Sequence, residues 1–285
     1  MFSPKISEKI AFACLTIAIA IVVAFVFTII FYIISNGIGA ISIDFLTQGP
    51  KNRMTEGGIF PAIVGTVFLI IGSMAVALPL GILAAIYLNE YAQEGRIVWI
   101  IQMAISNLAG TPSVVFGLFG LAMFVKYMGF GASILAASLT LALVVLPVII
   151  RASEEAMATI PPGLREASLA LGVTRWQTVR KIVLPIALPG MVTGAILSVG
   201  RVAGETAPIL LTGAAYFLPR LPDSVSDQFM ALPYHLFVLA TSGTNIAATR
   251  PIQYGTALVL LMIVLGVNFV AVMIRRHYKN KMRWG

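Results

Sequence analysis

Residues 10–34 read IAFACLTIAIAIVVAFVFTIIFYII, a run of 25 residues without a charged side chain. Crossing a hydrocarbon layer of roughly 30 Å takes about 20 helical residues, so this run is long enough to span a membrane. The apolar region of a cleavable signal is shorter, at about 7 to 15 residues. Lys5 and Lys9 precede the run on its N-terminal side. We therefore expect an uncleaved first transmembrane helix.

The rest of the chain has the same character. Of its 285 residues, 59% are hydrophobic and only 11% are charged, which excludes a soluble domain of ordinary composition. Five further apolar runs predict spans near Pro61–Leu88, Val98–Tyr127, Ala132–Ile150, Ile186–Gly204 and Gly255–Ile274. No disordered linker or internal repeat divides the chain. The sequence thus predicts an all-α membrane protein, with residues 1–285 forming a single transmembrane domain of six helices.

The basic residues set the orientation of these spans. A net charge of +8 could suit nucleic acid, but the basic residues lie between apolar runs rather than on one patch, so we expect no nucleic-acid partner. With the N-terminus inside, 13 Lys and Arg residues fall in inner segments and five in outer segments. Because positively charged loops stay in the cytoplasm, both termini are predicted to be cytoplasmic.

No motif of a catalytic centre is found in the sequence. It contains no phosphate-cradling Gly-x4-Gly-Lys loop and no metal-binding motif, and Cys14 is its single cysteine. We predict no enzyme activity and no metal or cofactor in this chain. If a transport step uses ATP and Mg²⁺, another subunit must hydrolyse the ATP.

Proline and glycine residues interrupt several of the predicted spans. Pro79 and Gly81 are expected to break the second helix, residues 110–112 the third, and Pro147 the fourth. Breaks at membrane depth tend to line protein or a cavity, because freed backbone groups need partners. A simple packing kink is the alternative at each position.

The longest cytoplasmic segment, residues 151–185, is predicted to form a helical hairpin. Pro161, Pro162 and Gly163 open it, and a short helix from Leu164 to Leu171 ends at Gly172. Thr174 is a suitable N-cap for a second short helix, which would run to Val183 and stop before Pro185.

This hairpin carries residues at fixed offsets. Glu166, Ala167 and Ser168 are followed after three residues by Gly172, and after nine more by Ile182, Leu184 and Pro185. The pattern resembles the EAA loop of ABC importer permeases, with Ser168 replacing its second alanine. In that family the loop holds the coupling helix, which sits in a groove of the ATPase. The resemblance therefore implies ATPase coupling by these residues and by Leu171, through the face that carries Glu166, Ala167 and Leu171.

Three further blocks narrow the resemblance. Residues 55–62, residues 111–117 and the run from Gly204 to Pro208 preceded by Arg201 are similar to the PstA-type permease of the phosphate importer. This likeness implies a type I permease of the cytoplasmic (inner) membrane, surrounded by lipid. It would pair with a second homologous permease and two ATPase subunits, receive inorganic phosphate from an extracytoplasmic phosphate-binding protein, and move it by alternating access. A permease for molybdate or sulfate is an alternative, and an ATPase-independent channel is a more distant one.

Arg201 and Glu205 are charged residues at the end of an apolar run. A charge in a membrane helix costs on the order of 3 kcal/mol, so such residues usually face protein or water. Their spacing of four places them on one helical face, which continues through the small residues Ser198, Gly194 and Gly190. Because arginine can bind phosphate oxygens with two parallel N–H groups, we expect both residues on the substrate pathway. A structural ion pair and snorkelling to the outer surface remain alternatives.

The break in the third span is a second candidate for the pathway. Asn107, Thr111 and Ser113 surround it, and a helix restarting at Pro112 would present free backbone N–H groups to an anion. The competing interpretation is that Thr111 only caps the restarted helix.

The outer segment, residues 205–254, is the longest connection. Its apolar pieces, Ile209–Leu218 and Phe229–Leu239, are too short to span and are expected to be re-entrant or interfacial. His235 and His277 are expected to lie at the surface.

Overall fold

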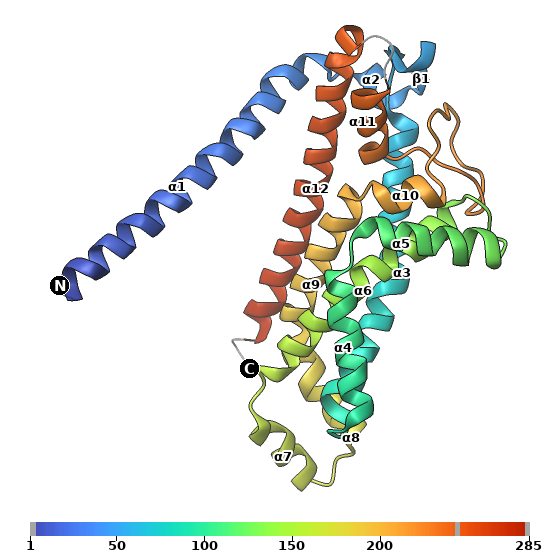
Figure 1. The fold of residues 1–285 in the computed structure, drawn as a ribbon. Coiled ribbons are helices and arrows are strands. Elements are labelled where there is room, and N and C mark those ends of the chain that lie inside the picture. Colours follow the sequence, from blue (N-terminus) through green and yellow to red (C-terminus); the bar gives the residue numbers. More distant parts are fainter. Residues whose placement is uncertain (1–3, 243–245, 283–285) are drawn as a thin grey trace.

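The computed structural model describes residues 4–242 and 246–282, and helices account for most of them (Figure 1). In chain order the α-helices are α1 (Pro4–Gly37), α2 (Ile43–Thr47), α3 (Phe60–Ile86), α4 (Arg96–Gly110), α5 (Ser113–Gly120), α6 (Ile134–Ala158), α7 (Pro162–Ala170), α8 (Arg175–Thr178), α9 (Leu184–Gly204), α10 (Ala207–Thr212), α11 (Leu232–Thr241) and α12 (Ile246–Met282). The short strands β1 (Pro50–Lys51) and β2 (Glu56–Gly57) pair antiparallel, Pro50 opposite Gly57. Short 3₁₀ turns lie at Ile38–Ala40 and Asn52–Met54, and π-helical turns at Tyr87–Tyr91, Leu121–Tyr127 and Val179–Val183.

Six spans can be traced among the described residues, as the sequence predicted. Five helices are long and apolar enough to cross a membrane, namely Glu8–Ala40, Phe60–Tyr91, Ile134–Ala158, Arg175–Gly204 and Thr249–Met273. Arg96–Gly110 and Ser113–Tyr127 pass the same test together, with a bend of 105° between them, and the pair taken as one makes the sixth span. In Figure 1, α12 ends toward the half of the molecule that carries α7 and α8, while α1 extends away from the bundle.

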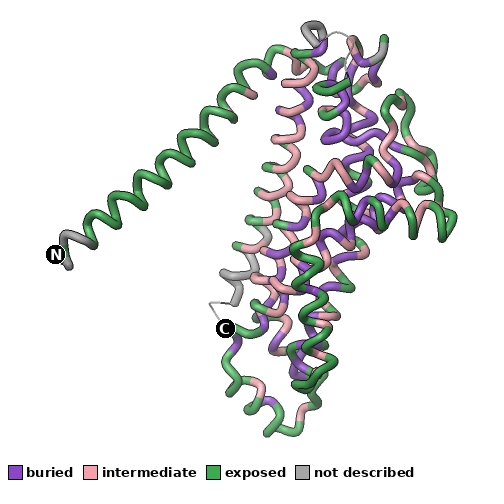
Figure 2. The backbone as a smooth tube through the Cα atoms, in the orientation of Figure 1, coloured by how far each residue is buried: buried purple, intermediate pink, exposed green. Residues whose placement is uncertain are grey.

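The centre of the bundle is built on α3, α6 and α9, which pack against one another (Figure 2). Lipid is as apolar as the side chains in this core, so close van der Waals packing rather than exclusion of water holds such helices together. The buried side chains at the centre include Leu69, Ala77, Leu141, Val145 and Ile149. By contrast, α1 leaves the bundle at a wide angle and is exposed over most of its length, while its C-terminal end packs on α12 (Figures 1 and 2).

Two of the three predicted helix breaks are wrong. Both α3 and α6 continue through their prolines, Pro79 and Pro147. Gly81 serves packing instead of a break, since a Cβ atom there would lie 2.6 Å from Cγ2 of Ile149 on α6. The third break, at residues 110–112, is confirmed by the 105° bend between α4 and α5.

The outer segment forms two short helices, α10 and α11, at the positions of its apolar pieces. The expectation that His235 lies at the surface is wrong, because its side chain is only 2% exposed within α11. Burial lowers the pKa of His235 to about 4, so the imidazole ring is neutral at pH 7. Most residues of α11 are apolar, so the sequence does not indicate which face of this helix packs against the core. The side chain of His277 lies outside the described part of the chain.

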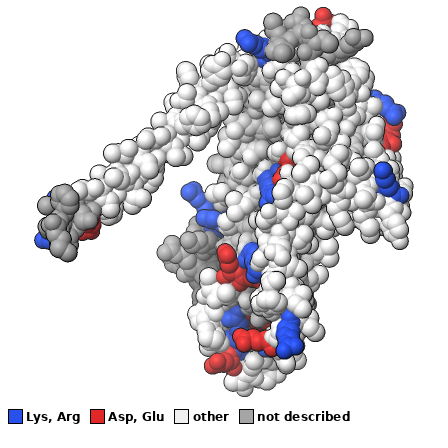
Figure 3. Space-filling view, viewed as in Figure 1, with Lys and Arg blue, Asp and Glu red and all other residues white. Residues whose placement is uncertain are grey.

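Most charged side chains lie toward the ends of the bundle and leave a broad band between them that carries few charges (Figure 3). Such a band is what a lipid environment requires of a membrane protein.

Candidate functional site

The predicted pair of charges forms at the C-terminal end of α9. Arg201 Nε donates to Oε1 of Glu205 over 3.1 Å, and Glu205 is the residue that ends the helix. The side chain of Arg201 is 35% exposed and that of Glu205 is 15% exposed. The remaining N–H groups of the guanidinium can therefore still reach a ligand. The substrate-pathway role of both residues stays a prediction.

The small residues beneath this pair bring α9 against α6. Added Cβ atoms at Gly190 and Gly194 would collide with the methyl groups of Ala156 and Ala152, and Ser198 is fully buried. Because this face of α9 is covered by α6, Arg201 and Glu205 are anchored on a helix held in close contact with the core.

Two breaks that lie far apart in the sequence meet in space. Glu205 leads directly into α10, and α10 packs on α5, the helix that follows the bend of the third span (Figure 1). Gly117 on α5 allows this approach, since a Cβ atom there would lie 3.0 Å from Cα of Pro208. The sequence blocks around residues 111–117 and 204–208 thus form one region between the two ends of the bundle.

The alternative interpretation of Thr111 is not supported by the structure. Its hydroxyl donates to the carbonyl oxygen of Asn107 at 2.8 Å, which belongs to the preceding helix α4. The N-cap residue that precedes α5 is Pro112, and it makes no side-chain capping hydrogen bond to that helix. Thr111 therefore ends α4 rather than capping α5. A role for Asn107, Thr111 and Ser113 in binding an anion remains a prediction.

The cytoplasmic hairpin forms largely as predicted. Gly172 follows α7 with φ +77°, a left-handed conformation that ends helices and favours glycine. Thr174 caps α8 through a reciprocal capping box with Gln177. Glu166, Ala167 and Leu171 are exposed, Leu171 to 83%. These three side chains leave an open surface on α7 and the turn after it.

One motif residue of the hairpin faces inward. Ser168 is 4% exposed, and its hydroxyl lies 2.8 Å from the hydroxyl of Thr178 on α8. This hydrogen bond joins the two arms of the hairpin. If Ser168 contributes to ATPase coupling, we expect it to do so by fixing the shape of the hairpin rather than by direct contact.

The prediction that the second arm of the hairpin stops before Pro185 is wrong. The helix is continuous from Arg175 to Gly204, so α8 runs directly into the fifth span. A π-helical turn at Val179–Val183 precedes Pro185 and accommodates the missing N–H of the proline. Ile182 and Leu184 lie on this continuous helix, both half-buried. The fourth span also extends beyond its predicted end, since α6 runs to Ala158.

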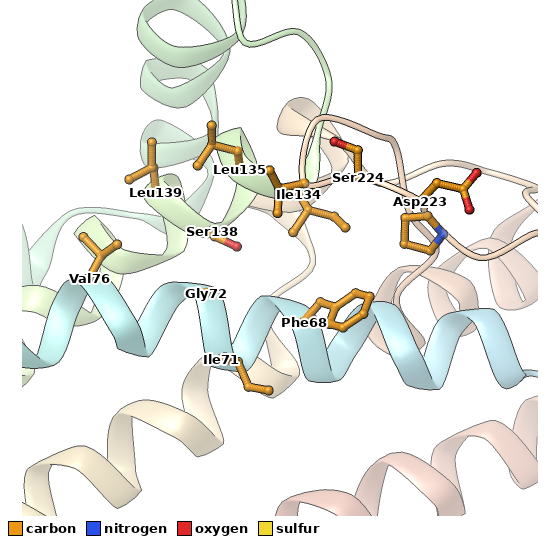
Figure 4. A pocket seen from close by; sticks show the side chains of 12 residues that line it. Phe68, Ile71, Gly72, Val76, Ile134, Leu135, Ser138, Leu139, Asp223 and Ser224 are labelled. Carbon is orange, nitrogen blue, oxygen red and sulfur yellow. The ribbon is translucent and has the colours of Figure 1, made fainter.

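A cavity of about 350 Å³ lies between α3, α6 and the outer segment (Figure 4). Its lining is mainly apolar, with Phe68, Ile71 and Leu139 among its side chains, and it includes no lysine or arginine among the described residues. An anion would find no positive charge there. None of the five candidate pathway residues lines it, so the cavity is separate from the candidate pathway.

Comparison with known proteins identifies the family. Residues 77–284 match the family described as binding-protein-dependent transport system inner membrane component. The chain belongs to this family. As a binding-protein-dependent inner membrane component, it is a multi-pass protein of the cytoplasmic membrane and a transport subunit rather than an enzyme.

Individual relatives match most of this inner membrane component. It is 35% identical over 279 residues to the probable ABC transporter permease protein YqgI of Bacillus subtilis (strain 168), covering 94% of each chain. It is 38% identical over 229 residues to the phosphate transport system permease protein PstA 1 of Mycobacterium tuberculosis (strain ATCC 25618 / H37Rv), covering 80% of this chain and 73% of the relative. The phosphate transport system permease protein PstA of Haemophilus influenzae is 30% identical, with 88% and 87% covered.

Solved structures confirm the fold. A chain of a bacterial ABC transporter involved in the import of the acidic polysaccharide alginate matches with a TM-score of 0.65 at 18% identity, covering 96% of this component and 99% of that chain. A chain of the MetNI methionine ABC transporter in an inward-facing conformation matches with a TM-score of 0.58 at 23% identity, covering 78% and 94%. The predicted architecture of a type I ABC importer permease is therefore correct.

One residue near the hairpin was not singled out by the sequence. Glu90 lies in the π-helical turn that ends the second span, yet its side chain is only 6% exposed and is paired with Arg165 of α7. In the sequence, Glu90 is an acidic residue at the cytoplasmic end of a predicted span, and such residues are common at membrane surfaces. Nothing near it in the sequence indicates a partner 75 residues away.

Proposed function

We propose that this chain is the membrane-spanning permease subunit of an ATP-driven importer that carries inorganic phosphate into the cytoplasm. The observation that carries the proposal is identity of 30–38% to phosphate transport system permease proteins over most of the chain. The Arg201 side chain is partly exposed in the last turn of α9, near the contact between α10 and α5. It supplies the positive charge that an oxyanion needs.

The assembly would contain a second homologous permease, two ATPase subunits and an extracytoplasmic phosphate-binding protein. ATP and Mg²⁺ would be bound by the ATPase subunits. The exposed face of Glu166, Ala167 and Leu171 supports a contact between the hairpin and an ATPase subunit, because an open amphipathic surface at the cytoplasmic end needs a partner.

Transport would follow from movement of the helices as rigid bodies. ATP binding would close the ATPase dimer and displace the hairpin, and α8 would pass this motion into the fifth span because the two form one continuous helix. The spans would then rock so that the region around Arg201 faces alternately outward and inward.

Reconstitution of the complex in liposomes tests this proposal. We expect ATP hydrolysis to be stimulated when the binding protein is loaded with phosphate, and phosphate to accumulate. Stimulation by molybdate or sulfate instead would assign another oxyanion to the same architecture. Phosphate flux without any ATPase subunit would indicate a channel and contradict the proposal.

A further inference from the structure

The hairpin is attached to the second span by a partly buried ion pair. Arg165 on α7 donates from Nη2 to Oε1 of Glu90 at 2.8 Å and from Nε to Oε1 and Oε2 of Glu90 at 3.0 and 3.3 Å. Glu90 belongs to the π-helical turn Tyr87–Tyr91, which continues α3 at its cytoplasmic end. An arginine and a carboxylate bound in this bidentate way have a fixed relative orientation.

The same guanidinium also binds the end of α6. Its Nη1 donates to the carbonyl oxygen of Ile160 at 2.9 Å, and its Nη2 donates to that of Met157 at 3.0 Å. Both accepting residues are buried, with exposures of 3% and 0%. Arg165 thereby joins α7 to the cytoplasmic ends of two core helices. It gives the Ile160 carbonyl a donor, and it adds a second donor to the Met157 carbonyl, which also accepts from the Ile160 N–H at 3.2 Å.

The second arm of the hairpin contacts the same turn. The guanidinium carbon of Arg175, at the start of α8, lies 5.7 Å from the centre of the Tyr91 ring. A cluster of buried apolar side chains lies beneath these contacts and includes Ile86, Leu88, Met157, Ile160, Val179 and Val183. The end of α3 is therefore held by both arms of the hairpin and by the core below it.

From these contacts we propose that Arg165 is a positioning residue that locks α7 to α3 through Glu90, so that displacement of the hairpin moves the second span. The inference rests on the proposed function in that an ATPase subunit must displace the hairpin. The helix that would receive the motion, α3, extends from the cytoplasmic end of the bundle to its outer end. At the outer end of α3, the hydroxyl of Thr66 accepts a hydrogen bond from the Leu232 N–H at the start of α11, at 2.9 Å.

A purely structural ion pair would stabilise the hairpin without linking its motion to α3. The two roles differ in their effect on coupling, which is the amount of substrate moved per ATP hydrolysed. Glu90→Gln removes the charge and keeps the shape, whereas Arg165→Lys keeps the charge and loses the fork. Glu154→Gln is a matched control, since Glu154 pairs with Arg151 at 3.0 Å within α6 and neither residue lies on α7 or α8.

The first measurement compares phosphate uptake and ATP hydrolysis by the full complex in liposomes. We expect Glu90→Gln and Arg165→Lys to retain the ATPase subunits and to hydrolyse ATP, while uptake per ATP falls by about tenfold, within the usual range of coupling between sites. Glu154→Gln should keep the wild-type ratio. A wild-type ratio in both test variants would overturn the proposal.

The second measurement does not depend on the substrate. Spin labels at the exposed positions Leu171 and Tyr87 report the distance between the hairpin turn and the end of α3. We expect this distance to be the same in the nucleotide-free and ATP-trapped wild-type complex and to differ between these states in Glu90→Gln. A distance that changes equally in wild type and variant would contradict the lock. Failure of the wild-type complex to move phosphate, with the distance behaving as expected, would contradict only the proposed substrate.

Discussion

Arg201 and Glu205 form an ion pair of 3.1 Å between Nε and Oε1, one helical turn apart at the end of the fifth span. Only one of the guanidinium nitrogens is used by this contact, and 35% of the arginine side chain is exposed. The pair therefore holds the arginine in place while leaving N–H groups available to an anion. Such an arrangement suits a residue that binds and releases substrate.

Close packing of α9 on α6 predicts a difference between two glycines of α9. Gly190→Ala places a methyl group 2.5 Å from Cβ of Ala156, whereas the nearest neighbour of a Cβ at Gly200 is 3.8 Å away. We expect Gly190→Ala to lower the free energy of unfolding by about 1–3 kcal/mol and Gly200→Ala to have little effect. Thermal unfolding of the purified permease in detergent measures both variants, and equal midpoints would show that this contact is not tight.

The two neighbouring motif residues of α7 should differ in crosslinking. Ala167 is exposed, while Ser168 is buried against Thr178. We expect a cysteine at position 167 to crosslink to a cysteine in the ATPase groove and one at position 168 to react poorly. Gel analysis of the crosslinked complex measures this. Efficient crosslinking from position 168 with none from position 167 would mean that another face of α7 meets the ATPase.

Gly172 should be sensitive to backbone conformation rather than to side-chain volume. Its φ of +77° disfavours most residues, but no atom lies within 4 Å of an added Cβ. We expect Gly172→Val to be destabilising by about 1–2 kcal/mol and Gly172→Asn to be milder, because asparagine tolerates this conformation. Co-purification of the ATPase subunit with each variant measures the consequence. Equal loss in both would show that the ATPase groove, rather than the backbone, restricts this position.

The break between α4 and α5 can be tested at Thr111 and Ser113. Thr111→Val removes the hydroxyl that binds the Asn107 carbonyl, and Ser113→Ala removes a hydroxyl at the first residue of α5. We expect both to reduce phosphate uptake by the assembled complex, while Thr111→Ser retains it. Normal uptake by Thr111→Val and Ser113→Ala would leave these residues a structural role only.

Local signals in the sequence predicted much of this architecture. The six apolar runs, the stop at Gly172, the N-cap at Thr174 and the break at residues 110–112 each depend on nearby residues. The errors arose where tertiary contacts decide the outcome. At Pro79, α3 stays helical while it is packed against α6. At Pro185, the helix continues after the π-helical turn Val179–Val183.

Features that depend on residues distant in sequence could not be predicted. The ion pair between Glu90 and Arg165 joins positions 75 residues apart, and the contact between α5 and α10 joins two separate breaks. Burial of His235 likewise depends on which face of α11 the core covers. In the candidate pathway, only the pairing of Arg201 with Glu205 followed from their spacing of four.

ATP-dependent uptake of phosphate by liposomes containing wild-type, Arg201→Gln or Glu205→Gln complex tests the central claim most directly. The account predicts that the wild-type complex accumulates phosphate, and that Arg201→Gln assembles with its ATPase subunits and still hydrolyses ATP but accumulates none. Glu205→Gln should assemble and transport more slowly, because its arginine is less firmly held. Uptake by both assembled variants at the wild-type rate would contradict a role for this pair on the phosphate pathway.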